Sequence, residues 1–349
     1  MRTSYRREDV VLLLKDITGQ VEPQSTEERE RLIQSGKHYS EMLPIEYVPT
    51  RQYMEVYEQA LDVYAKPTAD AIGVLADKII NSKGTNVILV SLARAGIPVG
   101  ILLKRYIKMK YDVDVPHYSI SIIRDRGIDK NAMRYLLHNY EPEQLQFVDG
   151  WIGKGVILSE LKRELSYFDG VSSNIAVIAD PANITDLCGT HDDILIPSSC
   201  LNSTISGLVS RTFLRSDVIM EDDYHGAVYY GGLKDSDLSY QFIDTIERNF
   251  STEPEVVERN IDGSGMDEVK KIAERYNIDD INFIKPGIGE TTRVLLRRVP
   301  WKVLIDLRYK EALELKHLVR LADEKNVPIE YYRMNHYKCC GIIRKLAEV

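Results

Sequence analysis

The stretch LQFVDGWIGKGVILSELKREL, residues 145–165, decides the fold of this chain. Its first residues, 145–148, form a short apolar run that predicts a buried strand, and in residues 156–165 the apolar side chains recur at helical spacing. Between the two lies the glycine-rich turn DGWIGKG, residues 149–155. This order places bare backbone N–H groups and a helix N-terminus at the carboxyl end of a strand, where a phosphate group binds well. Because Lys154 adds a positive charge, we predict that the turn binds the phosphate of a sugar phosphate or a nucleotide.

Strands and helices alternate on both sides of this stretch. The apolar runs at 86–90, 115–123 and 174–179 predict further strands, and helical periodicity fills residues 51–82 and most segments between the strands. Such alternation predicts an α/β fold with a mostly parallel sheet and helices on both faces. The functional loops of such a sheet gather at the carboxyl ends of its strands.

Breaks in this pattern divide the chain into parts. We expect an N-terminal extension at 1–50, the α/β core at 51–250, a linker at 251–265 and a second α/β unit at 266–349. The linker is assigned where the sequence is polar and contains proline and glycine. The second unit is predicted to be a small α/β/α sandwich with strands at 281–284, 301–305 and 329–333 and helices at 266–276, 290–298, 311–325 and 337–346.

The composition is that of an ordinary globular protein, with 349 residues of which 44% are hydrophobic and 28% charged. No apolar run is long enough to span a bilayer, and no small-residue cleavage site follows the first apolar run, so we expect neither a membrane partner nor a signal peptide. The four cysteines, Cys188, Cys200, Cys339 and Cys340, are too few for a disulfide framework, which favours the cytoplasm.

The net charge of −8 is unevenly distributed along the chain. Residues 265–349 hold 17 Lys and Arg against 13 Asp and Glu, whereas the remainder holds 28 against 40. An acidic body with a mildly basic C-terminal unit is compatible with an appendage that binds structured RNA or a ribonucleoprotein. We expect no DNA partner.

Two further strand ends carry groups suited to phosphate chemistry. The segment RAG, residues 94–96, follows the first core strand, and RDR, residues 124–126, follows the second. Transfer of a phosphorylated sugar with a pyrophosphate leaving group needs an amide cradle for the phosphate, cations for the pyrophosphate and a carboxylate near the ribose and its metal ion. These two segments, together with residues 149–155, supply such parts.

With these motifs the core, over roughly residues 60–215, resembles the type I phosphoribosyltransferases. Their motif for phosphoribosyl pyrophosphate (PRPP) is a strand, two acids, three variable residues and then Thr-Gly. Asp149 matches the first acid and Gly155 the closing glycine, whereas Gly150 replaces the second acid and Lys154 the threonine. The resemblance implies an enzyme that binds PRPP with Mg²⁺ and transfers phosphoribose to or from a nitrogenous base or a related small-molecule acceptor.

The same resemblance implies a role for each group at the three strand ends. Asp149 is expected to hold the ribose hydroxyls and, through PRPP, the Mg²⁺ ion. The expected catalytic residues are Asp149, Arg124 and Arg126, because the two arginines would stabilise the departing pyrophosphate. The expected ligands of PRPP and its phosphates are Arg94, Ala95, Gly96, Gly150, Gly153, Lys154 and Gly155.

A closer resemblance is to a divergent bacterial family found with tellurite-resistance and stress-response genes, which joins such a core to a Pelota-like RNA-binding domain. The phrases SLARAGIPVG (91–100), ISIIRDRGID (120–129), FVDGWIGKG (147–155) and IPSSCLNSTISGLVSRT (196–212) carry this resemblance. The family also bears the label cysteine protease StiP, which implies a chemistry different from phosphoribosyl transfer.

The C-terminal unit resembles the ribosomal L7Ae/L30/Pelota group of RNA-binding domains. Their RNA-contacting turn usually reads Gly-x-Asn-Glu-x-Thr-Lys, and here the sequence GIGETTR occupies residues 287–293, with Gly289 in the place of the asparagine. The resemblance implies that RNA is contacted by Gly287, Gly289, Glu290, Thr292 and Arg293.

Two alternatives to phosphoribosyl transfer stay open. One is a non-catalytic regulator that binds a nucleotide or RNA, which Gly150 favours because an acid is lost there. The other is a cysteine protease, for which Cys200 in a polar loop is the candidate nucleophile. A protease of this kind needs a histidine beside the thiol. His191 and His225 are the histidines nearest to Cys200 in the sequence, and neither lies in a recognisable protease signature.

Overall fold

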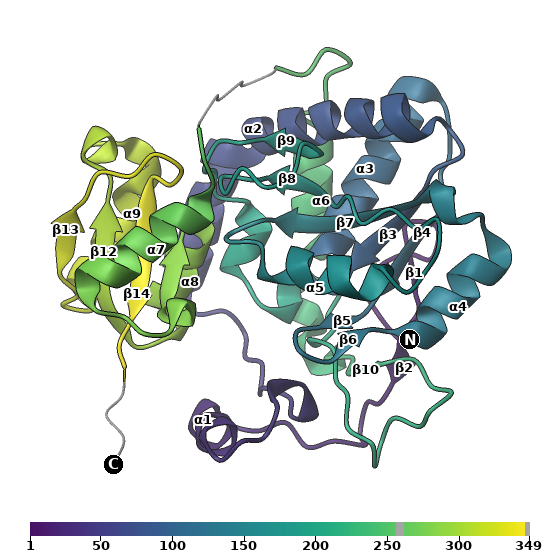
Figure 1. Cartoon of the computed structure of the whole chain (residues 1–349), viewed down its shortest axis with the longest axis horizontal. Helices are drawn as coiled ribbons and strands as arrows, with labels where there is room; N and C mark the ends of the chain where they lie inside the picture. The colour runs from purple at the N-terminus through teal and green to yellow at the C-terminus, as the bar shows by residue number, and fades with distance from the viewer. Residues whose placement is uncertain (256–261, 346–349) are drawn as a thin grey trace.

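The structure, a computed structural model, describes residues 1–255 and 262–345. Figure 1 shows a larger α/β part that carries both the N-terminal and central segments, and a smaller α/β part at the C-terminal end of the chain. The helices are α1 (Thr26–Gln34), α2 (Arg51–Lys83), α3 (Gly96–Tyr111), α4 (Lys130–Asn139), α5 (Val156–Leu165), α6 (Ser239–Glu247), α7 (Gly265–Tyr276), α8 (Ile288–Arg297) and α9 (Lys316–Glu324). The strands are β1 (Val11–Leu12), β2 (Lys15–Asp16), β3 (Ile88–Leu92), β4 (His117–Ile120), β5 (Ile122–Ile123), β6 (Gly127–Ile128), β7 (Leu145–Trp151), β8 (Ala176–Ala179), β9 (Cys188–Thr190), β10 (Gly226–Ala227), β11 (Ile284–Pro286), β12 (Pro300–Ile305), β13 (Ile329–Tyr331) and β14 (Cys339–Ile343).

A six-stranded sheet forms the centre of the larger part. Its order is β1-β4-β3-β7-β8-β9, and each neighbouring pair is parallel. The prediction of a mostly parallel sheet is therefore confirmed. Strand β7, which the opening stretch of the sequence predicted, lies in the interior of this sheet between β3 and β8.

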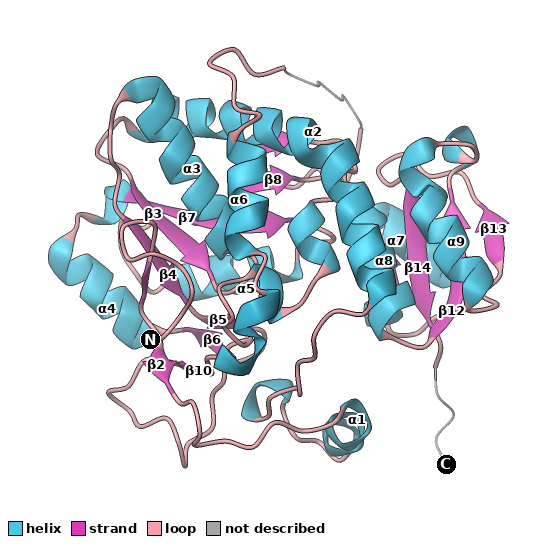
Figure 2. Ribbon diagram, turned by 180° about the vertical axis from the view of Figure 1, so that it is seen from behind, coloured by secondary structure: helices cyan, strands magenta, loops and turns pink. Residues whose placement is uncertain are grey.

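Helices cover both faces of this sheet, as the alternating pattern predicts. Apolar side chains of α2, α3 and α6 pack with Leu89, Val148 and Ile178 on one face, and those of α4 and α5 pack with Val90 and Phe147 on the other. Figure 2 shows α3 and α6 in front of the strands when the molecule is seen from behind. Alternate residues of β3 and β7 thus face opposite helical layers, which explains their continuous apolar sequences.

The C-terminal part is a four-stranded sheet with the order β11-β14-β12-β13, in which only the β12–β13 pair is parallel. Helix α7 packs on one face, and α8 and α9 pack on the other. The predicted helix at 337–346 is wrong, because its described residues contain strand β14 in the middle of this sheet. Residue 346 lies outside the described residues, as do residues 256–261 of the predicted linker.

Strand β14 was mistaken for a helix because it is buried on both faces. Cys339 packs toward α8 and α9, whereas Cys340 packs toward α7. A short apolar run without polar alternation carries no periodicity that separates a strand from a helix.

No helix within residues 1–255 and 262–345 combines the length and the apolar character needed to cross a membrane.

Hydrogen bonds at the turn after β7 and in the segment after β9 join the two parts of the molecule. The Tyr337 hydroxyl donates to the Gly153 carbonyl oxygen at 2.7 Å. The buried Asp193 carboxylate accepts from the backbone N–H groups of Ile288 and Lys338, each at 2.9 Å. Ile288 opens helix α8, so Asp193 also stabilises the N-terminus of that helix. The predicted phosphate turn therefore lies at the contact between the two parts.

Candidate functional site

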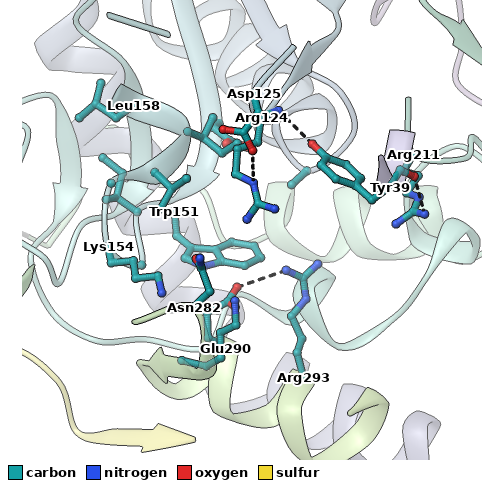
Figure 3. A pocket seen from close by; sticks show the side chains of 18 of the residues that line it. Tyr39, Arg124, Asp125, Trp151, Lys154, Leu158, Arg211, Asn282, Glu290 and Arg293 are labelled. Atoms are coloured by element: carbon teal, nitrogen blue, oxygen red, sulfur yellow. Dashed lines mark hydrogen bonds and ion pairs between the residues drawn. The ribbon is translucent and has the colours of Figure 1, made fainter. Parts of the chain in front are cut away.

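A cavity of about 690 Å³ lies where the core meets the N-terminal segment and the C-terminal part. Figure 3 shows its lining, with Trp151 between Lys154 and Arg293. Several groups that the sequence singled out line it together: Ala95, Arg124, Asp149, Gly153, Lys154, Gly155, Glu290 and Arg293. Three strand ends and the predicted RNA-contacting turn thus meet in one place.

The turn after β7 has the strand–turn–helix geometry that its sequence predicts. Gly155 has φ of 85° and directly precedes helix α5, whose first residue is Val156. An L-residue rarely adopts this left-handed conformation, so a glycine is required at this point. The N-terminus of α5 consequently opens into the cavity, with Gly155 and Val156 among the lining residues.

Asp149 is the acidic residue that begins this turn. Its carboxylate accepts a hydrogen bond from the Gly150 N–H group at 2.8 Å. Burial raises the pKa of Asp149 to about 6, and the nearby Arg293 offsets only part of that rise. Asp149 is therefore a carboxyl group that changes its charge close to neutral pH, inside a cavity.

We expect Asp149→Asn to stabilise the protein at pH 8. The folded state binds the Asp149 proton more tightly than the unfolded chain does, so this group costs stability as the pH rises from 4 to above 6. The amide mimics the protonated acid and should recover about 1–3 kcal/mol at pH 8, with almost no gain at pH 4. Denaturant melts at the two pH values measure the difference. The matched control Asp125→Asn changes an exposed carboxylate, and a gain as large as that of Asp149→Asn would contradict this account.

Lys154 lies in the cavity wall, but its ammonium group is already engaged. It donates to the carbonyl oxygens of Ile281 at 2.5 Å and Ile284 at 3.2 Å, both in the C-terminal part. Burial, with the neighbouring Lys285, lowers the pKa of Lys154 to about 8. In this conformation Lys154 joins the two parts of the molecule, and its predicted contact with phosphate stays a prediction.

The other predicted phosphate ligands are placed differently. Arg94 forms an ion pair with Glu46 at 2.9 Å and lines a neighbouring cavity of about 720 Å³. A side chain at Gly96 would come within 2.5 Å of the Val148 carbonyl oxygen, so this glycine allows α3 to approach β7. Gly150 is buried beside Ala95 and is not among the lining residues of the 690 Å³ cavity.

The two arginines of the RDR segment are separated by the fold. Arg124 lines the 690 Å³ cavity and pairs with Asp125 at 3.1 Å. Arg126 pairs with Glu41 at 2.7 Å and lines a different cavity. The sequence predicted that Arg126 would act together with Asp149. The structure instead places the Arg126 side chain at a different cavity. Both arginines lie in the turn that joins strand β5 to its antiparallel partner β6, and their side chains line different cavities.

Two aromatic rings and a partly buried arginine of the cavity were not predicted from the sequence. The Arg293 guanidinium lies 5.0 Å from the centre of the Trp151 ring. Tyr39 lies between Arg124 and Arg211, whose guanidinium groups are 5.6 Å and 5.5 Å from its ring centre. Figure 3 shows Arg124 and Arg293 extending toward the space beside Trp151 from opposite sides. Tyr39 and Arg211 are far apart in the sequence, which gave no signal of their contact.

The predicted RNA-contacting turn is partly covered by the core. Gly287 is buried against Asp193, and Thr292 is buried with its hydroxyl bonded to the Ile288 carbonyl oxygen and to His317. Neither is available to RNA in this conformation, which corrects the prediction for these two residues. Gly289 is half-buried near Ser199. Glu290 and Arg293 form an ion pair at 3.3 Å and remain partly exposed.

All four cysteines are free thiols and are buried. Burial raises the pKa of Cys200 to about 12, and its backbone carbonyl accepts a hydrogen bond from Arg297. Neither of the two histidines nearest in sequence contacts Cys200: His225 bonds Ser121 through Nδ1, and His191 lies beside a different thiol.

That thiol is Cys188, whose Sγ lies 3.4 Å from Nε2 of His191. His191 Nδ1 lies 2.9 Å from the backbone carbonyl oxygen of Asp180 and 3.8 Å from its carboxylate. A carbonyl oxygen only accepts, so Nδ1 carries the proton and Nε2 carries the lone pair. Sγ also lies 3.7 Å from Nδ1, so the thiol lies beside the imidazole ring and is not yet in line with that lone pair. Asp180 follows β8 and His191 follows β9, so adjacent parallel strands bring the three residues together. The sequence signal for this pair is a Cys-x-x-His at a strand end, which our sequence prediction did not include.

Metal ligands do not cluster in the described structure: within residues 1–255 and 262–345, no group of three or more His, Cys, Asp or Glu side chains is placed to hold a metal ion.

The fold and site define a two-part α/β protein, with a parallel-sheet core and a small C-terminal sheet domain that share a charged cavity. The family model described as "Tellurite-like stress resistance cysteine protease StiP" matches residues 3–247, and the one described as "PELOTA RNA binding domain" matches residues 263–345. The chain is 37% identical over 366 aligned positions to the "Cysteine protease StiP" of Acinetobacter baylyi (strain ATCC 33305 / BD413 / ADP1), with 99% of this chain and 94% of the relative covered. The chain therefore belongs to the StiP family.

These comparisons correct the activity predicted from the sequence. The family and its relative carry the description of a cysteine protease, so the prediction of PRPP-dependent phosphoribosyl transfer is wrong. The error has a physical origin, since a glycine-rich turn between a parallel strand and a helix serves many chemistries on α/β folds. The resemblance to the StiP family and the C-terminal Pelota-type domain are confirmed.

Proposed function

We propose that this protein is a cysteine peptidase in which Cys188 is the nucleophile, His191 the general base and Asp180 the group that orients the histidine. The observation that carries the proposal is that Cys188 Sγ lies beside the His191 ring, 3.4 Å from Nε2 and 3.7 Å from Nδ1, while Nδ1 is held by the Asp180 carbonyl oxygen. The relative's description as a cysteine protease supports the same class of reaction. A thiol, a base within reach and a third group that fixes the base are the parts that nucleophilic catalysis needs.

The chemistry follows from these contacts. Once Sγ is in line with the Nε2 lone pair of His191, Nε2 takes the Cys188 proton while Sγ attacks the carbonyl carbon of a peptide bond. The same nitrogen then gives the proton to the departing amine, which leaves a thioester. Water, deprotonated by Nε2, hydrolyses the thioester and restores the thiol.

Asp180 is held so that it can orient the base. One of its carboxylate oxygens accepts the backbone N–H groups of Ile184 and Thr185 at 2.6 Å and 2.8 Å. The other oxygen is buried without a hydrogen-bond partner among the described residues. Burial raises the pKa of Asp180. A proton gained by His191 during the reaction would be stabilised by this carboxylate.

Cys188 is covered in this conformation, and burial raises the pKa of its thiol to about 12. The thiol is therefore neutral at rest, and its deprotonation depends on His191. A surface cavity of about 470 Å³ is lined by Ile184 and Leu187, next to the nucleophile. The proposal accordingly includes a movement of residues 181–187, between β8 and β9, that opens Cys188 toward this cavity.

Hydrolysis of fluorescently labelled casein by the full chain tests the proposal. We expect Cys188→Ala to abolish hydrolysis and Cys200→Ala to retain it, although both changes remove one buried thiol. A peptidyl chloromethyl ketone should alkylate Cys188, as mass spectrometry of the digested protein would show. Alkylation of Cys200, with activity retained in Cys188→Ala, would move the nucleophile to Cys200. No hydrolysis and no alkylation would reject the peptidase.

The match of a PELOTA RNA binding domain supports a second role, RNA contact by the C-terminal part. Within the predicted turn, Gly289, Glu290 and Arg293 retain exposed surface for it. The four free thiols are compatible with the reducing cytoplasm.

A further inference from the structure

We propose that the 690 Å³ cavity binds the phosphate of a nucleotide, either free or at the end of a single-stranded RNA, with the base stacked on Trp151. The inference is independent of the peptidase, and it rests on the proposed RNA contact only for the source of the nucleotide. The proposed site is formed jointly by the core, the N-terminal segment and the C-terminal domain.

The charge of the cavity favours an anion. Its described lining holds eight lysines and arginines against three aspartates and glutamates. Lys285 and Arg211 form no ion pair with a carboxylate anywhere in the described ranges; Arg211 instead donates to the carbonyl oxygens of Tyr39 and Met42. A phosphate is the ligand that accepts several charge-assisted hydrogen bonds from arginines at once.

The pKa values of Arg211 and Lys285 are both lowered, in agreement with an excess of positive charge in the cavity. Burial, followed by other arginines nearby, lowers the pKa of Arg211 to about 10. Burial also lowers the pKa of Lys285; the neighbouring Glu290 opposes this shift, and Arg298, Arg124 and Arg293 add to it. Cations from the core and from the C-terminal part therefore repel one another across the cavity, and a bound dianion would relieve that repulsion.

The aromatic groups favour a nucleobase beside the phosphate. Trp151 lines the cavity and lies face-on to the Arg293 guanidinium at 5.0 Å. An arginine beside a partly exposed aromatic ring is a combination on which single-stranded nucleic acids stack their bases while their phosphates are neutralised. The positive end of α5 opens into the same space.

The neighbouring cavity of about 720 Å³ favours an RNA end over an isolated nucleotide as the source. It shares Arg211, Lys285 and Arg293 with the first cavity and adds Arg94 and Arg297. Arg297 likewise pairs with no described carboxylate, since it donates to the carbonyl oxygens of Cys200 and Leu201. The cationic surface therefore continues past the first phosphate position, as a strand of several nucleotides requires.

Fluorescence anisotropy with the full chain and a short oligouridylate, labelled at its 3′ end, tests the proposal. We expect the 5′-phosphorylated oligomer to bind about tenfold tighter than the 5′-hydroxyl oligomer. Uridine monophosphate should compete if the site takes free nucleotides. Binding of the monophosphate without binding of the oligomer would support the cavity as a nucleotide site and reject the proposed RNA contact. Equal affinity for the two oligomers, with no competition by the monophosphate, would overturn the proposal.

Arg124→Ala and Arg126→Ala form a matched pair for this assay. The two side chains lie two residues apart, are 42% and 44% exposed and each form one ion pair, but only Arg124 lines the cavity. We expect Arg124→Ala to weaken binding about tenfold and Arg126→Ala by less than twofold. Equal losses in the two variants would place the binding surface elsewhere.

Two further variants separate the base contact from the charge. Trp151→Ala should weaken binding about tenfold while Trp151→Phe retains most of it, because a benzene ring still stacks. Glu290→Gln should tighten binding, since it removes an acid from the lining and frees Arg293 from its ion pair. Displacement of the RNA by polyglutamate at matched charge concentration, with Trp151→Ala unchanged in affinity, would identify an acidic peptide as the ligand and overturn the nucleotide.

Discussion

Replacing His191 with alanine is expected to lower peptide hydrolysis about 10³-fold, which is the typical contribution of a positioned general base. The reason is the state of the nucleophile. Burial raises the pKa of the Cys188 thiol to about 12, so very little thiolate exists at neutral pH without a base. His191 Nε2 is the acceptor within reach of Sγ, at 3.4 Å.

The measurement must show whether His191 acts as a base or only supports the structure. In His191→Ala the remaining rate should rise with pH, because hydroxide then competes as the base, and added imidazole should restore part of it. His138→Ala, which changes an exposed histidine on α4, is the control and should leave the rate unchanged. Hydrolysis at the wild-type rate in His191→Ala would exclude this histidine from catalysis.

Removing the carboxylate of Asp193 is expected to have the largest effect on the integrity of the molecule. Asp193 is 2% exposed and accepts two backbone N–H groups of the C-terminal part at 2.9 Å. Asp193→Ala leaves both donors buried without an acceptor. We expect a loss of about 3–5 kcal/mol from the contact between the two parts.

Limited proteolysis and thermal unfolding measure this loss. Asp193→Ala should be cleaved faster between the core and α7, and its C-terminal part should unfold at a lower temperature. The control Asp192→Ala removes a partly exposed carboxylate that pairs with Lys338 at 2.7 Å, while Glu314 still pairs with the same lysine at 2.8 Å. Its effect should stay below about 1 kcal/mol. Equal effects of the two substitutions would show that Asp193 does not hold the contact.

The sequence predicts the four central strands of the core sheet but does not place β1 and β9 at its edges, and it predicts the C-terminal sheet less well. In the core, each parallel strand is flanked by helices with their own periodicity, so β3, β7 and β8 are each recognised by their surroundings. Strand β14 lies between two antiparallel neighbours and is buried on both faces, so its sequence CCGII lacks the alternation that marks a strand.

Some residues of the site could likewise be predicted from the sequence and others could not. Groups that follow a strand, such as Asp149 and Arg124, could be predicted because the carboxyl ends of parallel strands meet at one edge. Tyr39 and Arg211 could not, since their contact arises only when the N-terminal segment folds back over the core. The pair of Cys188 and His191 is local and could have been found from its spacing. The motif resemblances instead predicted phosphate chemistry, with Cys200 as the alternative nucleophile.

The two carbonyl contacts of Lys154 have a consequence for any ligand of the cavity. The turn that begins α5 is anchored on the C-terminal part at Ile281 and Ile284, so the cavity has its full set of walls only while the two parts are docked. Binding of a ligand in the cavity and docking of the two parts are then thermodynamically coupled. A ligand that bridges the walls strengthens docking by the same factor by which docking strengthens its own affinity. Ligand binding would thus increase the free energy needed to separate the C-terminal part from the core.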